Sequence, residues 1–162
     1  IVAGTGSDSQ LAASEVFGSL ADEGFAASLD YSKAYDSMSS EASADLFEAS
    51  GWPRGLCQVI RLVWGCQHRY VCWQGHVHPV PLRAAACVPQ GCPFGPVALS
   101  AWMASGLARV RLVPGLSLAR IFMDDRSFTS SSAQGLVHQV EAWECFSRAV
   151  GLRESAEKNS AY

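Results

Sequence analysis

Residues 118–130 read "LARIFMDDRSFTS" and place two adjacent aspartates, Asp124 and Asp125, between two short apolar runs. Such runs on either side of a polar pair are typical of two strands joined by a tight turn. Two neighbouring carboxylates repel each other unless a cation, a basic neighbour or water compensates them. The stretch therefore predicts an acidic β-hairpin, and its function depends on whether a third carboxylate joins the pair.

The third carboxylate is Asp30, in the segment "SLDYSKAYDSM" of residues 28–38, where it lies at the end of a strand predicted over residues 25–31. Mg²⁺ prefers hard oxygen ligands, usually one or two protein carboxylates with phosphate oxygens and water. Two such ions can activate a hydroxyl and stabilise a leaving pyrophosphate. Because this chemistry needs carboxylates from different strands, Asp30, Asp124 and Asp125 are the predicted metal-binding set. Taken singly, each aspartate is better explained by a turn or a solvated loop, and only their combination with a further motif favours a metal site.

A third segment, "VPQGCPFGP" of residues 88–96, lies between the two acidic segments. Gly91 and Gly95 allow the backbone to pass close to a ligand, and the prolines stiffen the turn. Gln90 offers both a donor and an acceptor just before that turn. Alone the segment is a weak motif, and its order between the other two is what makes it informative.

The apolar periodicity predicts an α+β fold with an antiparallel sheet rather than a doubly wound parallel one. A second hairpin is expected over residues 69–82, with its turn at Gln74 and Gly75. Helices are expected over residues 11–24, 39–51, 55–67, 96–110 and 134–151. The apolar face of the last helix is predicted to contain Leu136, Val137, Val140, Trp143 and Val150.

The chain of 162 residues fits one domain, and its apolar fraction of 49% is typical of a globular protein. No apolar run reaches the length of a membrane span, so no membrane partner is expected. The net charge of −3 argues against a simple nucleic-acid binder, but the stretch between Glu48 and Asp124 contains no acidic residue and seven arginines. Such a stretch fits a surface that meets a polyanion, and it equally fits arginines that solvate helix faces.

In sequence order, these motifs resemble the palm domain of reverse transcriptases, the RNA-directed DNA polymerases of non-LTR retrotransposons and group II introns. Residues 28–38 resemble the first palm motif, residues 88–96 the second, and "FMDD" within residues 121–128 the third. "GLRESAEKN", residues 151–159, resembles the fourth, in which a Gly-Leu pair precedes a lysine. The resemblance covers residues 10–160 and implies a palm whose antiparallel sheet has helices packed on one face.

The resemblance also implies roles for individual residues. Asp30 and Asp124 would bind the metal ions, with Asp125 as the accompanying carboxylate. Lys158, one of only two lysines, would donate a proton to the pyrophosphate. The remaining positions concern the substrate: Tyr35 would lie beneath the sugar and exclude ribonucleotides, and Gln90 and Gly91 would contact the incoming nucleotide and template. Lys33 and Asp36 match motif positions that we interpret as structural.

The implied activity is nucleotidyl transfer, in which a primer 3′-hydroxyl attacks a deoxynucleoside triphosphate opposite an RNA template. Mg²⁺ is the expected cofactor, with Mn²⁺ as a substitute, and the partners would be an RNA template and a DNA primer. Positioning and metal charge would carry most of the rate. The absence of a secretory signal indicates an intracellular protein, and a retroelement origin would place it in the nucleus.

Two departures from the family pattern set the expected domain organisation. No lysine or arginine precedes Lys33, so residues 1–24 are expected to be a lead-in and helix left from the fingers, with residues 25–162 as the palm. The thumb is expected to be absent, and the chain to be a fragment of a longer polymerase. Glu154 and Ser155 stand where an apolar residue and an asparagine are expected. The alternative function is therefore a catalytically silent palm that binds nucleic acid or a protein.

The cysteines and tryptophans allow two further interpretations. The six cysteines form no regular framework, which favours reduced and mostly buried thiols over disulfides. A zinc site across the second hairpin remains an alternative, although its ligand spacing is unusual. Its ligands would be Cys66, His68, Cys72, His76 and His78. The five tryptophans are expected mainly in the core, with base stacking as the alternative for Trp73.

Overall fold

The computed structural model of the chain describes residues 24–83, 87–114 and 116–161. The chain divides into two compact units. The first unit combines the residues up to Ala34 with those from Met103 onward, and the second unit comprises Tyr35–Trp102. The lead-in and nearly all of the helix predicted over residues 11–24 lie outside the described residues.

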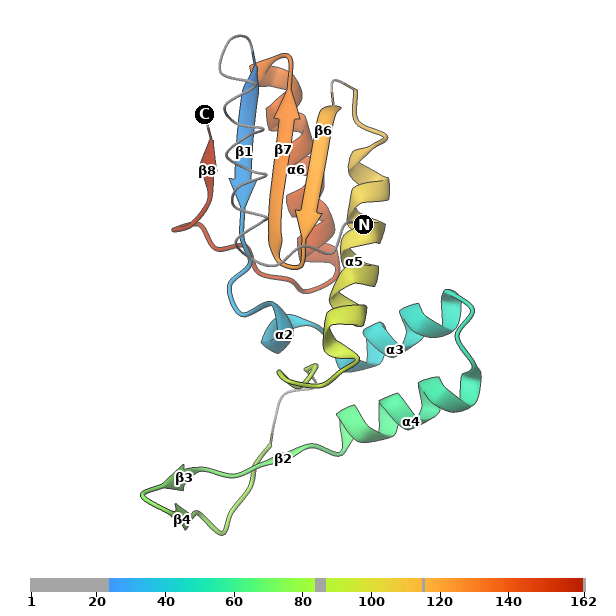
Figure 1. The fold of residues 1–162 in the computed structure, drawn as a ribbon, viewed down its shortest axis with the longest axis vertical. Helices are drawn as coiled ribbons and strands as arrows, with labels where there is room; N and C mark the ends of the chain where they lie inside the picture. Colours follow the sequence, from blue (N-terminus) through green and yellow to red (C-terminus); the bar gives the residue numbers. More distant parts are fainter. Residues whose placement is uncertain (1–23, 84–86, 115, 162) are drawn as a thin grey trace. The chain divides into compact units, whose positions relative to one another are not determined.

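The first unit contains a four-stranded antiparallel sheet in the order β6-β7-β1-β8 (Figure 1). Its strands are β1 (Phe25–Leu29), β6 (Leu116–Phe122), β7 (Asp125–Ser130) and β8 (Ser160–Ala161). The central pair is β1 and β7, with Ala27 opposite Phe128. Strand β8, near the carboxyl end, pairs with β1 and so brings the fourth motif beside the first.

Helix α6 (Ala133–Ala149) packs on β1, β6 and β7 and covers one face of this sheet (Figure 1). Phe128, which projects from β7, lies 5.4 Å from Trp143 between ring centroids, and both side chains are fully buried. The helix begins at Ser132, whose Oγ accepts a hydrogen bond from the amide of Gly135. It ends before Gly151, whose φ of +79° is the left-handed conformation typical of a helix terminus. The predicted end of this helix near residue 151 is thus confirmed.

Helix α5 (Gly95–Val110) packs its carboxyl-terminal half against α6 in the same unit. The close approach is at Gly106, where a Cβ would lie only 2.7 Å from the Phe146 ring and 2.8 Å from the Trp143 ring. The helix begins at Gly95 with Pro96 in its first turn, as predicted. The glycine at this position therefore lets the two helices approach each other closely.

The predicted apolar face of α6 is partly wrong. Val137 is 48% exposed, and the polar Gln139, which was not predicted on this face, is fully buried. Successive helical residues are about 100° apart, so the large buried side chains Leu136, Trp143 and Phe146 fix a face that excludes position 137. The buried face of α6 is thus set by its large side chains and not by the number of its valines.

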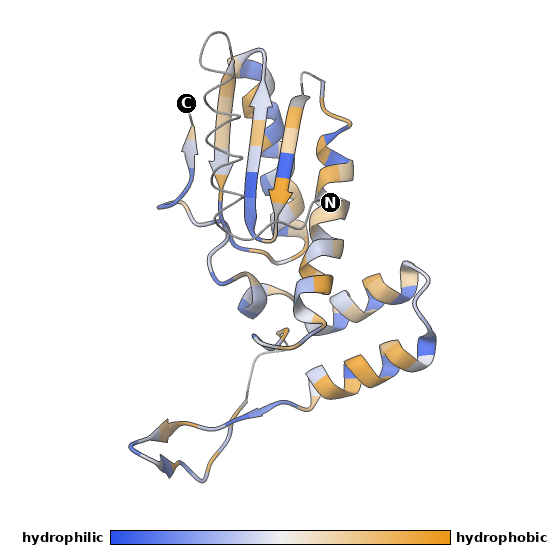
Figure 2. Ribbon diagram, in the orientation of Figure 1, coloured by the Kyte–Doolittle hydropathy of each residue, from blue (hydrophilic) through white to orange (hydrophobic). Residues whose placement is uncertain are grey.

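The second unit contains the helix pair α3 (Ser40–Ala49) and α4 (Arg54–Gly65), preceded by the short α2 (Ala34–Ser37). Ser39 caps α3 by accepting a hydrogen bond from the amide of Ala42, which confirms the predicted helix start. Apolar residues run along α4 (Figure 2), and its buried face comprises Cys57, Ile60 and Trp64. Val59 and Val63 of the same helix are more than half exposed.

An extended arm follows α4 in the second unit. Its outer pair is β2 (His68–Arg69) with β5 (Leu82–Arg83), and its tip is β3 (Cys72–Trp73) with β4 (His76–Val77). Gln74 and Gly75 have φ values of +48° and +82°, which confirms the predicted tight turn. Trp73 is 74% exposed at this tip, so its predicted place in the core is wrong, whereas Trp64 and Trp143 are buried.

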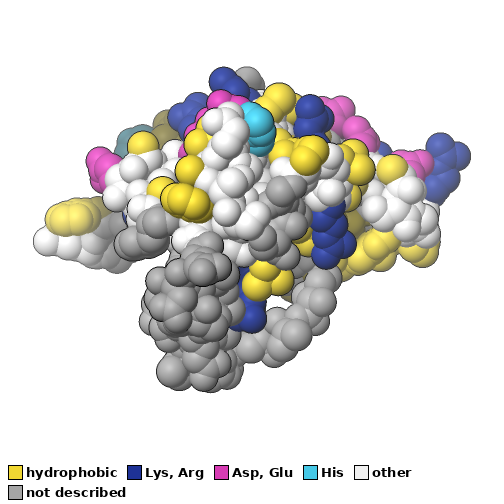
Figure 3. Space-filling view, turned by 90° about the horizontal axis from the view of Figure 1, so that it is seen from above, with side chains coloured by type: hydrophobic (Ala, Val, Ile, Leu, Met, Phe, Trp, Pro, Cys, Tyr) yellow, Lys and Arg dark blue, Asp and Glu magenta, His cyan; other side chains and the backbone are white. Residues whose placement is uncertain are grey.

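Within the described part of the chain, none of the helices is both long and apolar enough to span a membrane. Charged side chains of both signs are interspersed with apolar ones on the face seen from above (Figure 3). Two arginines of the acid-free stretch, Arg54 and Arg61, form ion pairs with Glu48 and Asp45. These two arginines therefore match the alternative in which such residues solvate helix faces.

Candidate active site

The three predicted metal-binding carboxylates lie at one end of the sheet of the first unit. Asp30 follows β1 directly, and Leu29 at the end of that strand is opposite Arg126. The next position outward on the neighbouring strand is Asp125, which opens β7. Asp124 occupies the two-residue turn of the β6–β7 hairpin together with Met123, whose φ is +55°. The register of β1 against β7 thus brings Asp30 to the acidic turn, as the sequence predicted.

The electrostatics of Asp125 show that these carboxylates act on one another. Partial burial raises the pKa of the Asp125 carboxyl, and the negative charges of Asp124 and Asp30 raise it further. The positive charges of Lys158 and Arg126 oppose this rise. The site therefore concentrates negative charge that a bound cation would compensate.

Lys158 contacts the first of these carboxylates. Its Nζ donates to Oδ2 of Asp30 at 2.5 Å, and the Asp30 side chain is only 14% exposed. The hydrogen bond and the charge of Asp30 raise the pKa of Lys158, and the charges of Asp124 and Asp125 add to this. Lys158 is thus held protonated beside the acidic cluster, which is the state that a proton donor needs.

Backbone pairing explains how a lysine distant in sequence reaches Asp30. The amide of Ser155 donates to the carbonyl of Asp30 at 2.9 Å, and the amide of Asp30 donates to Oδ1 of Asn159 at 3.0 Å. The amide of Ser32 donates to the carbonyl of Arg153 at 2.8 Å. The fourth motif therefore lies along the end of β1, with Lys158 in the turn between these contacts.

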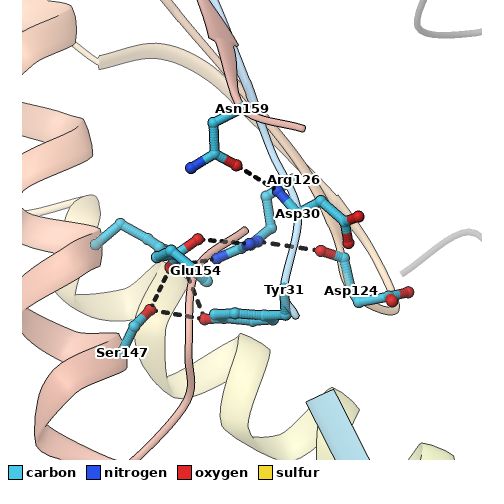
Figure 4. A network of polar contacts seen from close by, with 8 residues as sticks. Asp30, Tyr31, Asp124, Arg126, Ser147, Glu154 and Asn159 are labelled. Atoms are coloured by element: carbon cyan, nitrogen blue, oxygen red, sulfur yellow. Dashed lines mark hydrogen bonds and ion pairs between the residues drawn. The ribbon is translucent and has the colours of Figure 1, made fainter. Parts of the chain in front are cut away.

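A buried ion pair beneath the carboxylates was not predicted. Arg126 is fully buried and forms a bidentate pair with Glu154, with Nη1 to Oε1 at 2.8 Å and Nη2 to Oε2 at 2.9 Å (Figure 4). Its Nε donates to the backbone carbonyl of Asp124 at 3.1 Å. Glu154, a departure from the family pattern in the sequence, is therefore the partner of an equally unexpected arginine.

Aromatic and hydroxyl groups complete this network. The Arg126 guanidinium lies 3.4 Å from the centroid of the Tyr31 ring, a cation–π contact in a buried setting. The Tyr31 hydroxyl accepts from Nε1 of Trp143 at 3.0 Å and shares a hydrogen bond of 2.8 Å with Ser147. The Ser147 hydroxyl in turn lies 2.7 Å from Oε1 of Glu154. Burial raises the pKa of Tyr31, so this hydroxyl stays neutral.

The sequence contained one signal for this pair. Arg126 has the same strand parity as Phe128 and therefore faces α6, where a charged side chain needs a partner. Glu154 is separated from Arg126 by 28 residues, and nothing in the local pattern links the two. Asn159, which accepts the amide of Asp30, was also missed, because a side chain that binds a distant backbone amide leaves no periodic trace.

The predicted substrate residues lie in the second unit. Tyr35 is on α2, and a Cβ at Gly95 would lie 3.1 Å from its ring, so Gly95 and the Tyr35 ring are close neighbours. Gln90 is exposed, and Gly91 has a φ of +90°, which supports the predicted turn. Asp36 forms an ion pair of 3.6 Å with Arg69, which agrees with a structural role.

The structure brings together no zinc ligands in the described residues. No three His, Cys, Asp or Glu side chains there surround a common point closely enough to hold a metal ion as they stand. The cysteines are also less buried than predicted: Cys57 and Cys87 are buried, whereas Cys66, Cys72 and Cys145 are exposed. The exposed thiols belong to the arm and to the outer face of α6, where no core is available to cover them.

The acidic cluster still suits a hard divalent ion by the chemistry of its donors. It offers carboxylate oxygens from two adjacent strand ends, and partial burial, followed by the charges of Asp124 and Asp30, raises the pKa of Asp125. Lys158 already supplies one positive charge to Asp30. Carboxylate oxygens of this kind are the donors that a hard divalent ion prefers, so the chemistry of the cluster is compatible with such an ion.

Solved structures of low sequence identity share this fold. Telomerase from Candida tropicalis, in complex with a TWJ fragment of telomeric RNA, has a TM-score of 0.72 at 11% identity over 99% of this chain and 30% of that chain. The apo telomerase of the same organism, truncated from its C-terminal domain, has a TM-score of 0.72 at 13% identity over 99% and 35%. Telomerase from Candida albicans, with the same kind of RNA fragment, gives 0.67 at 13% identity over 99% and 30%.

These likenesses confirm the predicted α+β palm fold. The chain spans between 30% and 35% of the length of these telomerase chains. No curated protein matches the sequence. Residues 8–162 match the family described as reverse transcriptase (RNA-dependent DNA polymerase), and the chain therefore belongs to that family.

Proposed function

We propose that the chain is the palm of a polymerase that transfers deoxynucleotides to a primer 3′-hydroxyl, copying an RNA template. The observation that carries this proposal is the convergence of Asp30 with the Asp124–Asp125 turn at one end of the sheet. The family match supports the reaction class, and the geometry supplies the carboxylates that such a reaction needs.

Asp30, Asp124 and Asp125 would hold the divalent ions, which we propose to be Mg²⁺ with Mn²⁺ as a substitute. Two such ions, when bound, activate the attacking hydroxyl and stabilise the charge of the leaving pyrophosphate. The protein's part is to fix the carboxylates in space before the substrate arrives. Strand pairing does this for Asp30 and Asp125, and the tight turn does it for Asp124.

Lys158 is the proposed proton donor to the pyrophosphate. Its side chain is 67% exposed, so a substrate can reach it, and Asp30 keeps it protonated.

Substrate selection is proposed for the second unit. There Tyr35 would exclude ribonucleotides by its ring, and Gln90 and Gly91 would contact the incoming nucleotide and template.

The wider assignments are also proposals. The chain spans about a third of the telomerase chains to which it is similar, so fingers and thumb from a longer protein would complete the nucleic-acid channel. The description of the matched family as RNA-dependent supports an RNA template for this chain. We keep the non-LTR or group II subtype and an intracellular, nuclear location as proposals of the same kind.

Metal binding and synthesis test the proposed function together. We expect a Mn²⁺ titration followed by EPR to show saturable binding that strengthens with a deoxynucleoside triphosphate. The Asp30→Asn/Asp124→Asn variant should bind at least about tenfold more weakly, because it lacks two of the three ligands. Asp45→Asn is the matched control, since Asp45 is an exposed carboxylate on α3.

The same variants, placed in the longer protein, should differ in their ability to extend a primer on an RNA template. Loss of extension with Asp124→Asn but not with Asp45→Asn supports the polymerase. Equal Mn²⁺ binding by all variants would contradict it and would favour the alternative, a catalytically silent palm that binds nucleic acid or a protein.

A further inference from the structure

Three segments that carry the proposed active-site residues meet at one buried guanidinium, that of Arg126. The segments are the turn with Asp124 and Asp125, the end of β1 with Asp30, and the stretch with Lys158. Each segment comes from a different part of the sequence. Catalysis requires that the mutual positions of these segments be fixed to within a fraction of an ångström.

The contact with the turn is direct. Nε of Arg126 donates to the carbonyl of Asp124 at 3.1 Å, so the guanidinium holds the backbone of the residue whose side chain faces the metal site. Arg126 also follows Asp125 in the chain and points to the opposite face of the sheet. It can therefore fix the turn without occupying the site.

The contact with β1 runs through Tyr31, the residue after Asp30. The guanidinium lies 3.4 Å from the centroid of the Tyr31 ring, and that ring is only 2% exposed. Trp143 and Ser147 on α6 bind the Tyr31 hydroxyl and so prevent the ring from turning away. The position of Asp30 is thereby tied to the helix layer.

The contact with the fourth motif is the bidentate pair with Glu154. Glu154 also pairs through its backbone with Tyr31, and the next amide, that of Ser155, donates to the carbonyl of Asp30. The segment that positions Lys158 is thus fastened to Arg126 on one side and to β1 on the other.

We propose that Arg126 and Glu154 are positioning residues that hold the three carboxylates and Lys158 in register for metal binding. The proposal rests on the proposed function, because it assumes that the acidic cluster binds the metal. Neither residue touches the reacting atoms; both act on the residues that do. The competing explanation is that the pair only stabilises the fold.

A double variant separates the two explanations. A buried ion pair can often be replaced by apolar residues of similar volume without loss of stability, so Arg126→Leu/Glu154→Leu should remain folded. It removes the donor to the Asp124 carbonyl and the cation beside Tyr31. The positioning role predicts a drop in Mn²⁺ affinity of about 10- to 100-fold in this folded variant, the range seen when groups that orient metal ligands are removed.

A conservative variant gives the second measurement. Arg126→Lys keeps the charge but loses the planar fork and the bond from Nε, so we expect a smaller fall in Mn²⁺ affinity with the fold retained. Arg61→Leu is the matched control, because Arg61 forms the same kind of carboxylate pair on the exposed surface of the second unit. Its Mn²⁺ affinity should equal that of the parent chain. Circular dichroism and thermal melting establish that each variant is folded.

The outcomes are separable from those of the proposed function. If the parent chain binds Mn²⁺ in an Asp124-dependent manner and the folded Arg126 variants bind equally well, the positioning role is overturned while the function stands. If the parent chain shows no Asp124-dependent binding, the proposed function fails and the inference fails with it. If neither Arg126 variant folds, the pair serves the fold itself and the positioning role is likewise overturned.

Discussion

Each unit of the chain contains arginines paired with carboxylates, but the two arrangements differ in their surroundings. In the first unit, Arg126 is fully buried and makes a bidentate pair, a cation–π contact and a hydrogen bond to a carbonyl. In the second unit, Arg61 lies on the surface between Asp45 and Glu48, with Asp45 63% exposed. Water can therefore solvate the charged groups around Arg61, whereas it is excluded from the buried Arg126–Glu154 pair.

The difference teaches that counting ion pairs says little about their importance. An exposed pair gains little because water and salt screen it. In a buried pair, water cannot replace a missing partner, so the loss of one partner leaves an unpaired charge in an apolar environment. Figure 4 shows why this matters here, since Arg126 binds the backbone of Asp124 and lies against Tyr31, the residue after Asp30.

The largest expected effect comes from removing one partner of the buried pair. Glu154→Leu leaves the Arg126 guanidinium without its carboxylate, and we expect the free energy of unfolding to fall by about 3–5 kcal/mol. Glu48→Leu removes a carboxylate from the exposed cluster, so its denaturation midpoint should stay close to that of the parent chain. Urea denaturation followed by tryptophan fluorescence measures both. Equal losses would abolish the distinction between the two regions.

A smaller effect is expected from filling the close contact between α5 and α6. Gly106→Ala places a methyl group within 2.8 Å of two buried aromatic rings, and we expect a loss of about 1–3 kcal/mol. Gly55→Ala is the control in the second unit, because a Cβ there meets no atom within 4 Å. It should be neutral or slightly stabilising. A harmless Gly106→Ala in thermal melts would show that the helices can separate without cost.

The next effect has the opposite sign. Gln139 is fully buried on α6, and neither its amide nitrogen nor its amide oxygen has a hydrogen-bond partner among the described residues. Gln139→Leu removes this uncompensated polar group, so we expect the chain to gain about 1–2 kcal/mol in chemical denaturation. The exposed Gln58 on α4 serves as the control, where the same change should have little effect. A loss of stability with Gln139→Leu would mean that this amide is satisfied.

The smallest expected effect concerns the acidic site itself. Partial burial, followed by the charges of Asp124 and Asp30, raises the pKa of Asp125 above its usual 3.8. The carboxyl of Asp125 therefore binds a proton more tightly in the folded chain than in the unfolded chain. As the pH rises from 3.8 through the pKa of Asp125 in the folded chain, ionisation of this carboxyl lowers the free energy of unfolding. With a chelator present, Asp125→Asn should therefore be more stable than the parent chain at neutral pH.

The gain should vanish near about pH 3, where the aspartate is protonated in both states. Urea denaturation at several pH values measures it. Glu48 of the second unit shows the opposite behaviour, because its hydrogen bonds to Arg54 and Arg61 lower its pKa. A gain that grows toward acid would contradict the repulsion between the three aspartates.

Local features of the fold were predictable because their signals are local. The β6–β7 hairpin, the Gln74–Gly75 turn, the caps at Ser39 and Gly151, and helix α5 each follow from residues within one or two turns of each other. The convergence of Asp30 with the acidic turn was predicted from the motif order. The inward face of α6 was only partly predicted, because valines at several positions left its rotation open.

The Arg126–Glu154 pair was not predictable in the same way. Period-two alternation places Arg126 on the helix-facing side, but it does not identify the partner. That partner depends on how residues 153–160 return along β1, which backbone hydrogen bonds determine in three dimensions. The exposed Trp73 was missed for a related reason, since an aromatic residue in an apolar-rich hairpin looks the same in sequence whether or not a core covers it.

The buried pair also has an evolutionary consequence. A typical domain has only about 5–15 kcal/mol of total stability, so losing either partner alone would remove a large share of it. A lineage can reach or leave this pair most easily when both positions change together, or when the first change is offset elsewhere. Arg126 and Glu154 should therefore be inherited as a unit, and homologues should carry either both charges or neither.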